Sequence, residues 1–259
     1  MPAEFKPFLK HLARESGEVI KPYFGDASLA VERKGDESPV TIADRKAEET
    51  LRALINKEFP DHGIIGEEFG NENEDAEYVW VLDPIDGTIS FTTGCPLFGT
   101  LIGLQHRGLP ILGAIHQPIL GQLCIGDNET TTLNDRPVRI RETSATLAEA
   151  TLLCSCIKTV SEFQPEREAA FHELVKQVRV FRTWGDCYGY LLLASGFADI
   201  MIDPIMNPWD LQPVIPVVRG AGSVITSWTG DAPKDSAVAA PAGLHAEVLK
   251  VLKVLNPGE

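Results

Sequence analysis

The sequence lacks any long apolar run. No stretch reaches the ~18 continuous apolar residues that a membrane-spanning helix needs, because glycine, proline or charge interrupts each candidate. The N-terminus also lacks a basic start followed by an apolar stretch, so no signal peptide is indicated. These absences lead us to expect a cytoplasmic protein that has no membrane as a partner.

Cysteine is scarce as well, with five scattered residues in 259. Cys154 and Cys156 form a CxC pair, but neither a second pair nor nearby histidines follow to complete a zinc site. An odd and dispersed set of this kind is typical of reduced thiols in the cytoplasm rather than of a disulfide framework.

Positive charge is in deficit, because 23 Lys and Arg face 37 Asp and Glu and leave a formal net charge of -14. Such a surface repels nucleic acid and anionic lipid, so we expect neither as a partner. Hydrophobic residues make up 44% of the chain, which is ordinary globular usage and excludes disorder. An acidic protein that binds phosphate needs local positive charge, and bound divalent cations would supply it.

The order of helical and strand patterns predicts two layered halves. Apolar residues recur at helical spacing over 4–24 and 44–59. Short apolar runs typical of strands follow at 78–82, 98–105, 111–117 and 122–126 and complete the N-terminal half. The pattern then restarts, with strands expected at 147–156, 179–182 and 198–202 and helices at 165–178, 186–195, 210–219 and 243–255. We therefore predict an α/β protein of α+β layering, with subdomains over residues 1–140 and 141–259.

The strongest chemical signal is the segment Asp83–Thr88, which reads DPIDGT and directly follows the apolar run 78–82. Its proline fixes one φ angle and Gly87 permits a conformation that other residues resist, so a rigid turn can direct Asp83 and Asp86 at one point. Two carboxylates so close repel unless a cation lies between them, and Mg²⁺ prefers oxygen ligands. A helical turn after Gly87 would offer N–H groups to a phosphate. The alternative is an ordinary surface turn, since these residue types are common in turns.

Four ordered motifs together resemble those of the inositol monophosphatase family of metal-dependent phosphatases. They are PVTIAD at 39–44, GEE at 66–68, DPIDGT at 83–88, and Trp209-Asp210 before an Ala-Gly segment. The resemblance covers nearly the whole chain. It implies the sugar-phosphatase fold, with alternating α-β-α-β-α layers, an antiparallel N-terminal sheet and a mixed C-terminal sheet. It also implies that the N-terminal subdomain carries most metal ligands and the C-terminal one substrate specificity.

The resemblance assigns roles to individual residues. It implies a site for two or three Mg²⁺ ions, whose ligands would be Glu67, Asp83, the Ile85 carbonyl, Asp86 and Asp210. The catalytic residues would be Asp44 and Thr88, which orient and deprotonate the attacking water, together with Glu67. Backbone groups of Gly87 and Thr88 would hold the phosphate. Two metals would stabilise both sides of an in-line displacement, so no side chain need be phosphorylated.

Simpler interpretations of these residues stay open. Glu67 could be a solvated acid beside Glu68, and Asp44 or Asp210 could do no more than cap a helix. Lys34 could help to bind an anion, although a solvated lysine explains it equally well.

Substrate choice in this family depends on the second half of the chain. The segment 182–190 reads RTWGDCYGY, whereas members acting on inositol phosphates usually have a stretch of small residues here. The GDCYGY string resembles the histidinol-phosphate phosphatases of the family. Asp186 could pair with the amine or imidazole of that substrate, and Asp203 matches a substrate-contacting position. Alternatively, Asp186 is only the N-cap of a helix before Leu191.

The resemblance thus predicts hydrolysis of L-histidinol phosphate to L-histidinol and phosphate, a step of histidine biosynthesis, by a homodimer. Inositol 1-phosphate is the main alternative substrate, with a broader sugar or nucleotide phosphatase behind it. A non-catalytic relative of the fold is the alternative from another class. Pro213 and Pro216 depart from the usual Ala-rich helix after Trp-Asp. We expect Pro213 in the first turn of that helix if Asp210 caps it, and a kink at Pro216.

Overall fold

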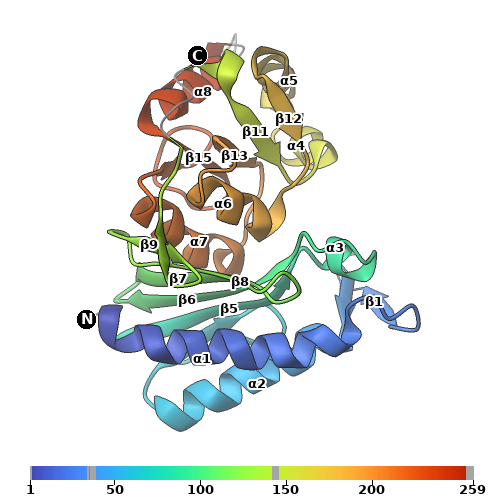
Figure 1. Cartoon of the computed structure of the whole chain (residues 1–259), viewed down its shortest axis with the longest axis vertical. Coiled ribbons are helices and arrows are strands. Elements are labelled where there is room, and N and C mark those ends of the chain that lie inside the picture. Colours follow the sequence, from blue (N-terminus) through green and yellow to red (C-terminus); the bar gives the residue numbers. More distant parts are fainter. Residues whose placement is uncertain (1, 34, 36–38, 142–145, 255–259) are drawn as a thin grey trace.

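The computed structural model describes residues 2–33, 35, 39–141 and 146–254. Figure 1 shows two long helices under one sheet, further helices in the middle, and a second sheet with its own outer helices at the other end. The succession is α-β-α-β-α, which confirms the predicted layering. Within the described residues, no helix is both long and apolar enough to cross a membrane.

The N-terminal half is built on an eight-stranded sheet. Its strand order is β10-β9-β8-β7-β6-β5-β3-β4. In chain order these strands are β3 (Gly63–Gly66), β4 (Gly70–Glu72), β5 (Tyr78–Asp86), β6 (Gly99–His106), β7 (Leu109–Gln117), β8 (Gln122–Gly126), β9 (Thr131–Leu133) and β10 (Arg136–Val138). All neighbours pair antiparallel except β3 and β5, which are parallel. The predicted antiparallel sheet therefore holds apart from this one pair.

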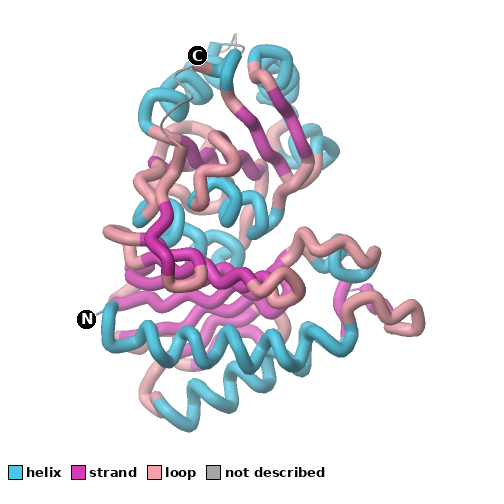
Figure 2. The backbone as a smooth tube through the Cα atoms, viewed as in Figure 1, coloured by secondary structure: helices cyan, strands magenta, loops and turns pink. Residues whose placement is uncertain are grey.

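Two helices cover the outer face of that sheet. They are α1 (Pro2–Ile20) and α2 (Ile42–Glu58), which lie side by side in Figures 1 and 2. Their apolar faces meet the sheet in a core that includes Leu9, Leu51 and Trp80. Between them the chain forms η1 (Lys21–Tyr23) and a small hairpin of β1 (Val31–Arg33) and β2 (Pro39–Thr41).

The C-terminal half contains a five-stranded mixed sheet, as predicted. Its order is β12-β11-β13-β15-β14, in which β11 pairs parallel with both neighbours and the other pairs are antiparallel. The strands are β11 (Thr151–Cys154), β12 (Val180–Arg182), β13 (Ile200–Asp203), β14 (Val224–Thr226) and β15 (Ala237–Ala240). Its outer side carries η2 (Leu147–Glu149), α4 (Ile157–Phe163), η3 (Pro165–Arg167), α5 (Glu168–Gln177) and α8 (Ala242–Val254). The predicted end of the last helix, at residue 255, lies outside the described residues.

The middle layer joins the two sheets through a shared core. It consists of α6 (Asp186–Ala194) and α7 (Pro208–Gly220). One apolar cluster contains Leu101 and Ile115 from the N-terminal sheet, Leu191 and Leu211 from the two helices, and Met201 from the C-terminal sheet. The middle helices therefore bury one face of each sheet, which brings residues from both halves to one place.

A row of glycines seats α7 on the N-terminal sheet. Gly113 pairs across the strands with both Gly103 and Gly126. A Cβ atom on Gly113 would lie 1.9 Å from the Pro213 carbonyl oxygen, and one on Gly126 would lie 2.4 Å from that of Pro216. Because no side chain separates the two backbones, the helix rests directly on the strands.

The helix α7 corrects one expectation about its prolines. It begins at Pro208 after the N-cap Asn207, so Pro213 lies in its second turn and not in the first. The assigned helix continues through both Pro213 and Pro216. Each proline lacks the N–H of a helical bond to the carbonyl four residues earlier. The Pro216 carbonyl also accepts from the Asn128 N–H at 3.1 Å, which ties the helix to the segment after β8.

Candidate active site

The DPIDGT segment does not form the predicted turn from Asp83 onward, because strand β5 continues through Asp86 and the turn comes at Gly87. The register of β5 against β6 is irregular between Asp83 and Asp86, and Asp86 still pairs with Gly99. The Asp83 carboxylate accepts from the Ile85 N–H at 3.0 Å, and Thr88 Oγ1 donates to the Ile85 carbonyl at 3.1 Å. Thr100 of the neighbouring strand donates to the Pro84 carbonyl at 2.9 Å. These bonds hold the Asp83 carboxylate and the backbone between it and Asp86 in place.

Asp210 of α7 joins the two carboxylates of this segment. One ligand oxygen each from Asp83, Asp86 and Asp210 lies within 4.8 Å of the others. Burial and the charges of Glu67 and Asp86 raise the pKa of Asp83 well above its ordinary value. Burial, with the charge of Glu67, also raises the pKa of Asp210 to about 7. A divalent cation between the three would relieve this repulsion, so the residues fit a metal centre of oxygen ligands.

Glu67 approaches the same group from the end of β3. Its backbone N–H donates to the Leu82 carbonyl at 3.2 Å, which places it beside the strand that carries Asp83. Its side chain is half-buried, and its charge raises the pKa of both Asp83 and Asp210. The simple interpretation of a solvated acid therefore does not describe its surroundings.

Asp44 lies in the first turn of α2, and its two carboxylate oxygens have different surroundings. Its Oδ2 accepts from the Thr41 N–H at 2.9 Å and from Thr41 Oγ1 at 2.6 Å, which closes the capping box of the helix. Its Oδ1 is buried and has no hydrogen-bond partner among the described residues. Burial, with a contribution from the charge of Glu67, raises the pKa of Asp44 to about 6. Capping thus occupies one oxygen and leaves the other without a protein partner among the described residues, while the catalytic role of Asp44 stays a prediction.

Gly87 links this group to the substrate segment predicted downstream. Its φ of 88° lies in the left-handed region, and it precedes the short helix α3 (Thr88–Thr92). A Cβ atom here would lie 3.0 Å from Asp186 Oδ2 and 3.1 Å from the Leu97 carbonyl oxygen. Glycine therefore allows both the turn and the close approach of Asp186. Phosphate binding by the backbone of Gly87 and Thr88 stays a prediction.

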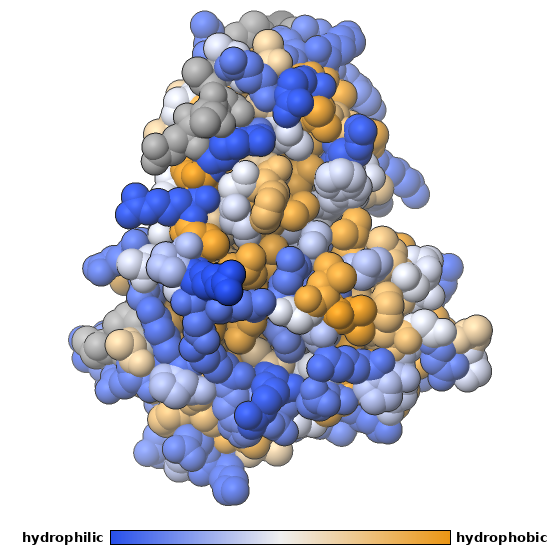
Figure 3. All heavy atoms as spheres, in the orientation of Figure 1, coloured by the Kyte–Doolittle hydropathy of each residue, from blue (hydrophilic) through white to orange (hydrophobic). Residues whose placement is uncertain are grey.

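A cavity of about 390 Å³ adjoins the carboxylates. Its wall includes Asp86, Asp186, Asp203 and Asp210, and its lining residues, all of them described, contain no Lys, Arg or His. Apolar side chains such as Met206 complete the wall. In Figure 3, hydrophilic residues cover most of the visible face, and hydrophobic ones gather near the junction of the two halves. The cavity is therefore acidic and partly apolar.

Asp186 has an unusual backbone at the first position of α6. Its φ of 50° lies in the left-handed region, which costs a residue other than glycine some strain. Ser155 Oγ holds it by accepting the Asp186 N–H at 2.8 Å. The N-cap of α6 is Gly185, and no side-chain capping bond to this helix is found among the described residues. Burial and the charge of Asp203 raise the pKa of Asp186 to about 7.

Asp203 lies in the cavity wall with both oxygens engaged. Its Oδ1 accepts from Ser155 Oγ at 2.6 Å and its Oδ2 from the Tyr190 hydroxyl at 2.9 Å. Sequence reasoning missed Ser155, which carries no motif signal and is brought here only by the sheet. Tyr190 follows Asp186 by four residues, a spacing that puts both on one helix face. Lys34 lies outside the described residues.

The helix α6 also contacts the metal-ligand group directly. The Cys187 N–H donates to Asp86 Oδ2, and the Cys187 thiol lies 3.9 Å from the Asp86 carbonyl oxygen. This bond joins the GDCYGY segment to a predicted metal ligand a hundred residues earlier in the chain. The cavity and the carboxylate group therefore form one continuous site.

Comparisons with known proteins give matches over most of the chain. A family model described as the inositol monophosphatase family matches residues 1–255. The chain is 47% identical over 222 residues to the chloroplastic bifunctional phosphatase IMPL2 of Arabidopsis thaliana, covering 85% of this chain and 63% of that relative. The chain thus spans less than two thirds of the length of that protein.

Two other relatives match over most of their length. A histidinol-phosphatase of Chlorobaculum parvum is 39% identical over 222 residues, covering 85% of this chain and 84% of that protein. A solved structure of an inositol monophosphatase from Zymomonas mobilis has a TM-score of 0.82 and 34% identity, covering 94% of this chain and 95% of that one.

Proposed function

The chain belongs to the inositol monophosphatase family of metal-dependent phosphatases, and from that premise we propose that it hydrolyses L-histidinol phosphate with Mg²⁺ as cofactor. One observation carries the substrate assignment. The cavity wall holds Asp186 and Asp203 in addition to the metal-ligand carboxylates, and its described lining offers no cationic side chain. A substrate with a protonated amine and an imidazole suits such a wall better than a neutral polyol does.

The metal centre would hold two or three Mg²⁺ ions. Its ligands would be Glu67, Asp83, Asp86, Asp210 and the Ile85 carbonyl. Bound Mg²⁺ would supply the positive field that activates water and neutralises the charge growing on the leaving alcohol oxygen. The clustered oxygens of Asp83, Asp86 and Asp210 support this assignment, since their raised pKa values reflect burial and repulsion that a cation relieves.

The remaining chemistry belongs to side chains of this protein. Asp44 has a free oxygen that can take a proton from the attacking water, and its pKa of about 6 makes it a stronger base than an ordinary aspartate. The Thr88 hydroxyl donates to the Ile85 carbonyl, so its own oxygen can accept from the water. The backbone at Gly87 and Thr88 would bind the phosphate, and Asp186 would orient the substrate cation.

Parallel kinetics on two phosphate esters test the proposal. With Mg²⁺ present, kcat/KM for L-histidinol phosphate should exceed that for inositol 1-phosphate. Replacing Asp186 by Asn removes a partly buried charge partner, so kcat/KM for histidinol phosphate should fall on the order of tenfold to a hundredfold, and less for inositol 1-phosphate. Equal or faster turnover of inositol 1-phosphate by the wild type would contradict the substrate assignment.

Inositol 1-phosphate is the second candidate, because an inositol monophosphatase is among the solved structures that resemble this chain. A broader sugar or nucleotide phosphatase would show comparable kcat/KM over several esters in the same assay. A non-catalytic relative would hydrolyse none of them, and the Asp83→Asn variant would then match the wild type. The homodimer and the cytoplasmic location stay predictions, for which sedimentation and cell fractionation are the direct tests.

A further inference from the structure

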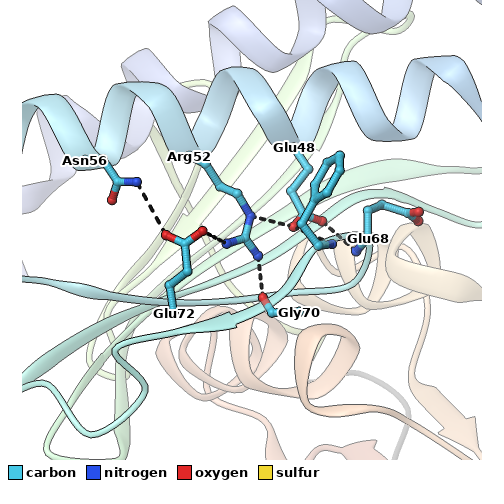
Figure 4. Close-up of polar contacts among 7 residues, drawn as sticks. Glu48, Arg52, Asn56, Glu68, Gly70 and Glu72 are labelled. Atoms are coloured by element: carbon cyan, nitrogen blue, oxygen red, sulfur yellow. Dashed lines mark hydrogen bonds and ion pairs between the residues drawn. The ribbon is translucent and has the colours of Figure 1, made fainter.

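A buried carboxylate lies one turn beyond Asp44 on α2. The Glu48 side chain is fully buried. Its Oε2 accepts the Glu68 N–H at 2.8 Å, and its Oε1 accepts the Phe69 N–H at 3.2 Å (Figure 4). One acidic side chain of the helix thus binds two consecutive amides directly after Glu67, a proposed metal ligand. No part of the catalytic scheme above uses this side chain.

Arg52 lies one helical turn after Glu48 on α2 and contacts the same neighbouring segment. Its Nε donates to Glu48 Oε1 at 2.8 Å and its Nη1 to Glu72 Oε1 at 2.9 Å, while its Nη2 contacts the Gly70 carbonyl. Only 7% of Arg52 is exposed. Figure 4 shows Glu48 and Arg52 pointing from one face of α2 onto the segment that follows Glu67. The guanidinium therefore neutralises the buried carboxylate and holds the segment 68–72 at a second point.

The chain before Glu67 is packed against the same ion pair. A Cβ atom on Gly66 would lie 2.1 Å from Glu48 Oε1 and 2.6 Å from Arg52 Nη2. Only glycine leaves room for the pair at this position. Glu67 is consequently fixed on both sides, by close packing at Gly66 and by hydrogen bonds at Glu68 and Phe69.

A buried ion pair is weak evidence for a purely stabilising role, because its loss of hydration can exceed its attraction. Geometry is the better explanation here. Asp44 stands in the first turn of α2, and Glu48 stands one turn later on the same rigid helix. The helix that carries the proposed base thereby also sets the position of the proposed ligand Glu67.

We propose that Glu48 and Arg52 are positioning residues that hold Glu67 in place for metal binding. This role rests on the proposed metal-dependent function. The test is Mg²⁺ titration calorimetry on substrate-free protein, together with thermal unfolding and the Mg²⁺ dependence of kcat. Residues that orient a metal ligand typically change metal affinity by about 10- to 100-fold, and we expect a loss of that size for Glu48→Gln. Saturating Mg²⁺ should restore kcat, while KM for the ester stays near the wild-type value.

The chain offers a matched control in its other half. Asp199 is also fully buried, accepts from Arg141 Nε at 2.9 Å, and accepts the Thr151 N–H at 2.7 Å. Asp199→Asn should therefore lower the melting temperature as Glu48→Gln does, but leave the Mg²⁺ affinity unchanged. Arg52→Lys is the variant to measure if Glu48→Gln does not fold. It keeps the positive charge but loses the branched guanidinium contacts. It should weaken Mg²⁺ binding less than Glu48→Gln does.

The outcomes separate this role from the proposed function. A Glu48→Gln protein that folds, or failing that an Arg52→Lys protein, must bind Mg²⁺ more weakly than both the wild type and Asp199→Asn. If it unfolds at a lower temperature but binds Mg²⁺ like the wild type, the ion pair is structural and the positioning role is wrong. If the wild type binds no Mg²⁺, the metal-dependent function itself fails and this role fails with it.

Discussion

Two helices from opposite halves begin in the same way, each with a predicted site aspartate in its first turn. In α2 the Asp44 Oδ2 accepts the Thr41 N–H at 2.9 Å and the Thr41 hydroxyl at 2.6 Å. In α7 the Asp210 Oδ2 accepts the Asn207 N–H at 2.8 Å and the Asn207 amide at 3.2 Å. Each aspartate is the third residue of its helix, and each completes a capping box.

The difference between the two lies in the surroundings of each carboxylate. Asp44 Oδ1 is buried without a partner among the described residues, whereas Asp210 lies within a group of carboxylates. The same local motif therefore presents a single unpaired oxygen in one case and a member of a carboxylate cluster in the other. The capping bonds hold one carboxylate oxygen, which fixes the side-chain rotamer and therefore the direction of the second oxygen. Capping and chemistry are thus complementary roles, and the neighbours decide which chemistry follows.

The largest effect should come from removing the ligand in α7. Asp210→Asn keeps an oxygen for the cap but loses the charge that faces Asp83 and Asp86. Metal stabilisation of the transition state is worth several kcal/mol, so kcat/KM should fall on the order of a thousandfold. Mg²⁺ affinity, measured by calorimetry, should fall as well. Wild-type affinity in this variant would show that Asp210 serves only as a cap.

Asp44→Asn should lower kcat/KM less than Asp210→Asn does. Comparing the two variants should distinguish the roles of the two aspartates. General-base catalysis contributes about a hundredfold at the lower end, and we expect kcat/KM to fall by that order. Mg²⁺ affinity should remain close to the wild-type value, in contrast to Asp210→Asn. The pH–rate profile of the wild type should rise through the pKa of this base, and the variant should lose that rise. A variant that loses Mg²⁺ binding instead would assign Asp44 to the metal centre.

Unfolding of the metal-free protein should depend on pH through the same carboxylates. Folding raises the pKa of Asp44 to about 6 and that of Asp210 to about 7, above the ordinary 3.8. These two carboxyls therefore bind more protons in the folded state, so their contribution to stability is greatest below about pH 4 and is lost as pH rises through 6 and 7. One pKa unit corresponds to about 1.4 kcal/mol, so the loss from Asp44 should be about 3 kcal/mol.

Urea unfolding between pH 4 and pH 8, with and without Mg²⁺, measures this dependence. Mg²⁺ should oppose the loss at high pH, because the ionised carboxylates then gain their cation. Asp44→Asn and Asp210→Asn should each flatten the metal-free curve. A metal-free protein that becomes more stable from pH 4 to pH 7 would contradict these pKa directions.

The smallest effects should come from the capping residues themselves. Thr41→Ala and Asn207→Ala each remove a side-chain contact, and such losses cost about 1 kcal/mol. Thr41 is buried and Asn207 exposed, so the former change should be the more harmful. Thr41→Ser should restore stability because it keeps the hydroxyl. If Thr41→Ala lowers kcat while Thr41→Ser does not, the cap is also needed to aim Asp44.

The parts of the site that sequence reasoning found are those that lie close together along the chain. Asp83 and Asp86 are three residues apart on a strand whose apolar run was readable, so their convergence was predictable. Asp210 entered only through the family resemblance. Its helix start was misplaced because Asn207-Pro208, a good N-cap with proline at the first position, was not used as a signal. That oversight also put Pro213 in the wrong turn.

Contacts made only by the tertiary fold were out of reach. Ser155 follows β11 and meets Asp186 and Asp203 through the order of the C-terminal sheet, which no local pattern specifies. The parallel pairing of β3 with β5 was missed for a similar reason, since β3 is a four-residue strand with two glycines. Glu48 and Arg52 had an i, i+4 spacing, but their burial depends on the segment packed over them.

The row of glycines under α7 limits how this protein can be recombined with its relatives. At Gly113 the carbonyl of Pro213 lies 1.9 Å from where a Cβ atom would be, so an alanine there would push the helix, and Asp210 with it, away from the strands. Consider a chimera with residues 1–140 from one relative and 141–259 from another. Its glycines would come from the first parent and the helix α7 that packs on them from the second. Such hybrids should retain activity only where both parents have matching glycines and helix backbones.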